Sequence, residues 1–70
     1  MESEQRGWEL RATARQADGQ WTALVEVWEP GKRRTHSAQV VPFTRQFPSR
    51  EEAEQAGIDE ARRWVVQQTR

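Results

Sequence analysis

The sequence contains no cysteine, no tyrosine and no excess of charge of either sign. Without cysteine the chain forms no disulfide and no thiolate metal site. Cysteine content therefore does not indicate whether the protein works in an oxidising or a reducing compartment. Its 11 Lys and Arg balance its 11 Asp and Glu, which argues against a dedicated nucleic-acid binder, whose affinity comes largely from excess positive charge. No apolar run approaches the length of a membrane span, and no signal-peptide core follows the first residues. We therefore expect a cytoplasmic protein with no membrane contact.

One amphipathic helix is predicted over the last third of the chain, from Ser49 to about Gln68. Small and apolar side chains recur on one stripe of this segment, at Ala53, Gly57, Ala61, Trp64 and Val65. Ser49 followed by Glu52 is typical of a capping box at a helix N-terminus. Glycine inside a helix costs roughly 1 kcal/mol relative to alanine. We therefore expect the helix backbone to lie close against a sheet at Gly57.

A β-hairpin is predicted around Asp18-Gly19, a residue pair that favours a two-residue type I′ turn. Apolar and polar residues alternate from Trp8 onward and again from about Trp21 to Glu29, with the period of a half-buried strand. The turn sets a register with three apolar pairs, namely Ala14–Ala23, Ala12–Val25 and Leu10–Val27. These pairs share one face, which the helix should cover.

A third strand is predicted from about Thr35 to Val41, with Phe43 as its latest end. Pro42 removes a ladder donor and is typical of an edge strand. Two orientations stay open, and a bulge would allow both in sequence. In one, the side chains that point to the core are His36, Ala38 and Val40, and in the other they are Val41 and Phe43.

The expected fold is α+β, a three-stranded antiparallel meander with one C-terminal helix packed on one face. A single domain is expected over residues 7–68 because no second composition pattern or internal repeat is found. Residues 1–6 are polar and charged, and we expect them to form a disordered tail.

The segment from Phe47 to Ala53 reads FPSREEA and is followed by Gly57, Ala61 and Trp64. This pattern resembles the C-terminal signature of small, uncharacterised bacterial single-domain proteins, classed as domains of unknown function. The preceding hairpin is similar too, so the resemblance covers most of residues 7–68. It implies a β-β-β-α fold and a bacterial origin, and it implies no catalytic or binding residue.

No catalytic, cofactor or metal site is predicted. His36 is the only histidine, and no cysteine or second histidine accompanies it as a metal ligand. As a general base it would need an orienting acid and a nucleophile, and the spacing suggests neither. Gly19 and Gly31 are isolated, so no phosphate-binding loop is expected. We therefore expect a protein that is not an enzyme.

The predicted register places a mixed set of side chains on the sheet face away from the helix. The candidate interaction surface on that face comprises Arg11, Thr13, Leu24, Glu26 and Trp28. An exposed Trp beside Arg and apolar neighbours has the composition of an interaction hot spot. Alternatively, Trp28 lies over Glu9 and covers its own edge of the sheet, and both interpretations stay open. The predicted function is a protein-interaction module, homodimeric or with an unknown protein partner.

A basic loop supports a second hypothesis. Lys32, Arg33 and Arg34 follow the second strand without an acidic residue among them, and such a loop can contact phosphates. With the open sheet face, it would make a weak nucleic-acid-binding domain, by analogy with domains that stack bases on sheet aromatics. The zero net charge weighs against this alternative.

Overall fold

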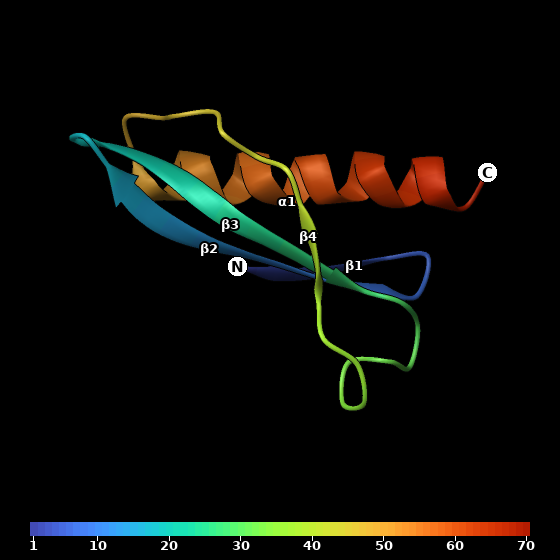
Figure 1. Ribbon diagram of the computed structural model, residues 1–70. Helices are drawn as coiled ribbons and strands as arrows, with labels where there is room; N and C mark the ends of the chain where they lie inside the picture. The colour runs from blue at the N-terminus through green and yellow to red at the C-terminus, as the bar shows by residue number, and fades with distance from the viewer.

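The computed structural model describes residues 1–70 and contains one antiparallel sheet and one helix (Figure 1). The strands lie in sequence order in the sheet: β1 (Glu2–Gln5), β2 (Trp8–Ala17), β3 (Gln20–Trp28) and β4 (Gln39–Val41). The helix α1 (Arg50–Gln68) lies across one face of the sheet (Figure 1). It lacks the apolar length needed to cross a membrane.

The β2–β3 hairpin has the register that its turn predicts. Asp18 and Gly19 have φ angles of 51° and 81°, so both central residues adopt the positive φ that a type I′ turn requires. The paired residues are Leu10 with Val27, Ala12 with Val25, and Ala14 with Ala23. The predicted ladder is therefore confirmed.

The helix approaches the sheet most closely at Gly57. A methyl group on Gly57 would lie 3.0 Å from Ala12 Cβ and 3.1 Å from Val25 Cγ2. The core around this contact consists of Leu10, Ala12, Ala23, Val25, Val27, Val41, Ile58, Ala61 and Val65. The close approach expected from a glycine inside the helix is thus present.

The start of α1 also follows its sequence signal. Ser49 is the N-cap, and its hydroxyl oxygen accepts a hydrogen bond of 3.2 Å from the Glu52 backbone N–H. Glu51 and Glu52 lie in the first turn, where the helix dipole favours negative charge. The predicted cap is confirmed.

The predicted number of strands is wrong, because Glu2–Gln5 forms β1 instead of a disordered tail. The segment is entirely polar and shows no apolar alternation, so periodicity gave no signal for a strand. Arg6 and Gly7 have φ angles of 53° and 84° and make a second two-residue turn. β1 is held by its ladder with β2 and by Arg62 Nη2, which donates a 2.7 Å hydrogen bond to Ser3 Oγ.

The amino group of Met1 joins this first strand to the helix. It donates hydrogen bonds to the Ala12 carbonyl at 2.8 Å and to Glu54 Oε2 at 2.9 Å. The hydrogen bond from this ammonium holds the pKa of the Glu54 carboxyl below its usual range. Residues assigned to a tail therefore connect both layers of the fold.

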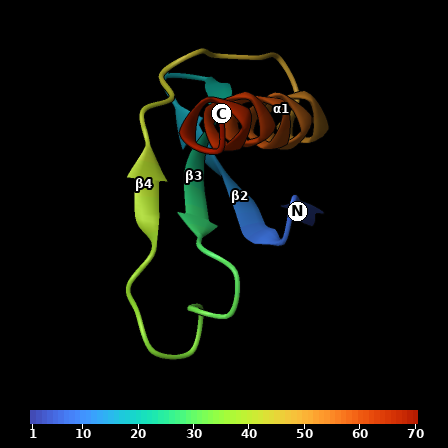
Figure 2. The same ribbon diagram turned by 90° about the vertical axis from the view of Figure 1, so that its right-hand side faces the viewer.

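The third predicted strand is the short β4, which starts later than Thr35. The Thr35 and His36 N–H groups donate to the Lys32 carbonyl at 3.2 and 2.9 Å, so this segment closes a turn and does not extend along β3. Val41 is 2 % exposed and Val40 is 61 % exposed, which settles the open question in favour of Val41 pointing inward. Residues 29–38 form a connection that projects beyond the strand ends, away from α1 (Figure 2).

Candidate interaction surface on the open sheet face

The sheet face opposite α1 carries no second layer of secondary structure (Figures 1 and 2). The structure brings all the side chains of the candidate surface onto this face, with Arg11 paired with Glu26, Thr13 with Leu24, and Glu9 with Trp28. Their common placement follows from the hairpin register, because alternate residues of a strand point to opposite faces.

A cross-strand ion pair occupies the centre of this open face. Arg11 Nε and Nη2 lie 2.9 and 2.8 Å from Glu26 Oε1. Thr13 is exposed and Leu24 is half-buried beside this pair. The two opposite charges cancel, so the centre of the face is polar and carries no net charge. Partly exposed ion pairs of this kind contribute little to stability.

Trp28 faces away from α1, as the register predicts, but it is only 7 % exposed. Two guanidinium groups cover its ring, with Arg33 Cζ 4.4 Å and Arg11 Cζ 5.3 Å from the ring centroid. The interpretation of Trp28 as an exposed hot spot is therefore wrong. Trp28 is the cross-strand partner of Glu9. Its ring is covered mainly by Arg33, which belongs to the connection after β3. Strand pairing alone does not predict where a residue of that connection lies.

Arg33 joins the connection to the first two strands. Its Nη1 lies 2.6 Å from Glu2 Oε1 on β1 and 3.6 Å from Glu9 Oε2 on β2. The hydrogen bond and charge of Arg33 hold the pKa of the Glu2 carboxyl below its usual range. In return, the hydrogen bond to Glu2 raises the pKa of the Arg33 guanidinium. Arg33 is thus committed to carboxylates of its own chain.

Replacing Arg33 with alanine is expected to raise the pKa of the Glu2 carboxyl toward its ordinary value, because the variant removes both the hydrogen bond and the positive charge. An NMR titration of the Glu2 side-chain carboxyl carbon measures this shift. In the unaltered chain the lowered pKa means that the pair stabilises the fold above the ordinary carboxyl range, and that this contribution fades as the pH falls through the folded-state pKa. Arg34→Ala is the matched control, since Arg34 is exposed. An unchanged Glu2 pKa in the Arg33 variant would contradict the pairing.

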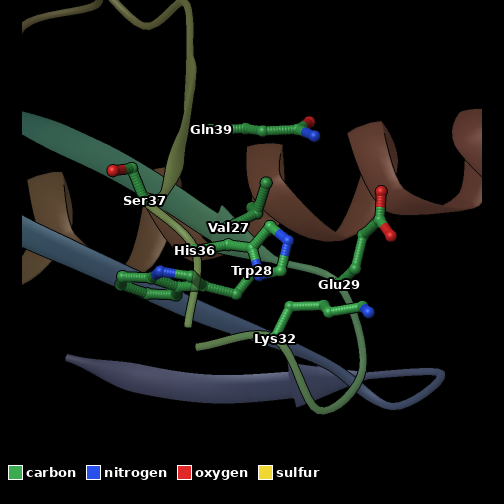
Figure 3. Close-up of a pocket in the computed structure, with 7 residues that line it drawn as sticks. All are labelled: Val27, Trp28, Glu29, Lys32, His36, Ser37 and Gln39. Atoms are coloured by element: carbon green, nitrogen blue, oxygen red, sulfur yellow. The ribbon is translucent and has the colours of Figure 1, made fainter. Parts of the chain in front are cut away.

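A small pocket of about 110 Å³ lies beside Trp28. Its lining side chains are Val27, Trp28, Glu29, Lys32, His36, Ser37 and Gln39. Figure 3 shows the Trp28 ring extending to one side of the pocket and the Glu29 and Lys32 side chains extending to the other. His36 Nδ1 is hydrogen-bonded to Thr35 Oγ1 at 2.7 Å, and no group of three or more metal-ligating side chains is present.

The candidate phosphate contacts Lys32, Arg33 and Arg34 do not act as one basic patch. Lys32 and Arg34 are exposed, whereas the Arg33 guanidinium is paired with Glu2 and Glu9. The charge of the loop that is free to meet a phosphate is therefore lower than the sequence suggests.

Two surface features escaped the sequence analysis. Val40 is a strongly exposed apolar side chain on the open face, opposite Glu26, and its orientation was open at that stage. A basic groove of about 460 Å³ lies between β1 and the end of α1, lined by Gln5, Arg62, Arg63, Val66, Gln67 and Arg70. Arg70 lies beyond the last residue of α1, and nothing in the sequence predicts that β1 lies beside this end of the helix.

Comparisons of the chain with protein-family models, curated proteins and solved structures find no match. The resemblance of the Phe47–Ala53 segment to small bacterial proteins of unknown function therefore stays a prediction.

Proposed function

We propose that this chain is a non-enzymatic protein-interaction module that binds its partner through the open sheet face. The observation that carries the proposal is Val40, which is 61 % exposed on a face that no other element covers. Half-buried Leu24 lies on the same face two residues before Glu26, the strand partner of Val40, and exposed Pro42 directly follows β4. An exposed apolar side chain set among polar ones, with further apolar residues close by, has the mixed composition of many protein interfaces.

A second copy of the chain is the partner that the charges of this face favour. Among the charges of this face, Glu4 on β1 and Arg15 on β2 are exposed and lie outside the ion pairs that Arg11 and Arg33 make within the chain. A two-fold interface places a surface against itself, and a surface with both signs can then oppose acid to base. A surface of one sign would repel its own copy.

Nucleic-acid binding has less support. Base stacking on the sheet would need an uncovered aromatic ring on the open face, and the Trp28 ring is already covered by Arg33. The exposed cations of the loop belong to a chain whose overall net charge is zero. The chain therefore has no excess positive charge to attract a nucleic acid.

Replacing Val40 with glutamate is expected to shift the protein toward monomer, because a charge would be buried at the centre of the apolar contact. Light scattering over a concentration series from about 10 µM to the millimolar range measures the mass, since small polar interfaces are weak. Gln67→Glu, an exposed change on the opposite layer, is the control. A protein that is monomeric at all concentrations, or a Val40 variant that associates like the unaltered chain, would contradict self-association through this face.

A further inference from the structure

The Trp28 ring and two carboxylates enclose one guanidinium, that of Arg33. Its Cζ lies 4.4 Å from the ring centroid, and its Nη1 lies 2.6 Å from Glu2 Oε1 and 3.6 Å from Glu9 Oε2. One cation thus meets an aromatic face from β3 and acids from β1 and β2. We name these three side chains, Glu2, Glu9 and Trp28, the Trp28 site.

The chemistry of the Trp28 site fits arginine better than lysine. A guanidinium is planar, is weakly hydrated, contacts an aromatic face and carries five N–H donors, whereas an ammonium is a compact and strongly hydrated point charge. Glu9 Oε2 is screened from solvent and yet accepts no hydrogen bond. Buried acceptors are normally paired, so the site has acceptor capacity that Arg33 leaves unused.

The segment that supplies Arg33 contacts the sheet through that side chain, and its Pro30 ring lies against Gly7 in the β1–β2 turn. From Glu29 to Ser37 every residue except Arg33 is exposed. The backbone hydrogen bonds of this connection join its own residues, such as Lys32 N–H to the Glu29 carbonyl at 3.0 Å. Arg33 can therefore leave the Trp28 site without breaking a hydrogen bond of the sheet ladder.

We propose that the Trp28 site recognises an arginine side chain of a partner peptide, and that Arg33 occupies the site in cis in the free protein. A side chain tethered by a short connection competes at an effective concentration of the order of millimolar. A partner therefore displaces Arg33 when it adds contacts on the adjoining open face at Leu24 and Val40. The inference rests on the proposed function in taking a protein as the partner and the open face as its contact surface, and its test involves no self-association.

The test removes the cis ligand and supplies a soluble one. Arg33→Ala is titrated with N-acetyl-argininamide, and the Trp28 indole N–H signal, identified by its loss in Trp28→Phe, is followed by NMR. We expect a saturable shift of this signal at millimolar ligand, with the apparent Kd about twofold weaker in the unaltered protein, because a cis competitor at an effective concentration close to the Kd roughly doubles the apparent value. N-acetyl-lysinamide should bind more weakly to the same variant.

Two further variants complete the test. Arg34→Ala keeps the cis ligand and should bind like the unaltered chain, and Glu2→Gln with Glu9→Gln in the Arg33→Ala background should abolish the saturable shift. If Arg33→Ala fails to fold, Arg33→Lys takes its place, and N-acetyl-argininamide should bind it more tightly than it binds the unaltered protein. A folded Arg33 variant without a saturable Trp28 shift, or with equal affinity for the lysine and arginine probes, would overturn the proposal. Neither result bears on association through Val40.

Discussion

Replacing Gly57 with leucine is expected to destabilise the fold strongly, because no space exists for a side chain at that point of the helix. A methyl group alone would already lie 3.0 Å from Ala12 Cβ, 3.1 Å from Val25 Cγ2 and 3.2 Å from Ala23 Cβ. These neighbours lie on two paired strands, so they cannot move apart independently. Overpacking a core in this way typically costs about 1–3 kcal/mol, a large part of the stability of a domain of this size.

Urea unfolding measures the effect, with Gln55→Leu as the matched control. Gln55 is exposed on the same helix, and leucine favours a helix about as much as glutamine does, so this control should change the free energy of unfolding by less than about 0.5 kcal/mol. Leucine also favours a helix more than glycine does. A Gly57→Leu variant as stable as the unaltered chain would therefore show that the helix does not touch the sheet at Gly57.

The parts of the fold that could be predicted are those whose signals are local. The Asp18-Gly19 turn fixes the hairpin register through two positive φ angles, and Ser49 fixes the start of the helix through its cap. β1 could not be predicted because its stability comes from contacts distant in sequence, such as Arg62 with Ser3 and Arg33 with Glu2. A polar edge strand has no apolar face for periodicity to detect.

The sequence predicts on which face of the sheet the candidate site lies, but it does not predict how exposed the side chains of the site are. Strand parity sends Trp28 and Leu24 to the face away from the helix, and the structure places them there. Parity says nothing of what a connection does after the strand ends. The connection turns back on the Lys32 carbonyl and places Arg33 over the Trp28 ring, beside Arg11, and these contacts accompany the burial of Trp28.

Replacing Trp28 with alanine is expected to cost about 3–5 kcal/mol, as truncation of a buried aromatic typically does. The ring is 7 % exposed and lies outside the main core beneath α1. Its loss would leave the Arg33 guanidinium without its aromatic contact and Glu9 without its cross-strand neighbour. An exposed tryptophan, by contrast, would lose little stability on truncation. Urea unfolding of the monomer separates the two expectations.

Thr13→Ala is the control for the same face, because Thr13 is exposed on β2, where it is the cross-strand partner of Leu24. This substitution should change the free energy of unfolding by less than about 0.5 kcal/mol. Arg33→Ala should also cost little, since ion pairs at the surface contribute little to stability. We therefore expect a large decrease in the free energy of unfolding for Trp28→Ala and a small one for Arg33→Ala. This difference distinguishes the contribution of the Trp28 ring from that of the Arg33 side chain that covers it. A Trp28→Ala variant as stable as the Thr13 control would show that the ring is not buried in solution and that no Trp28 site exists.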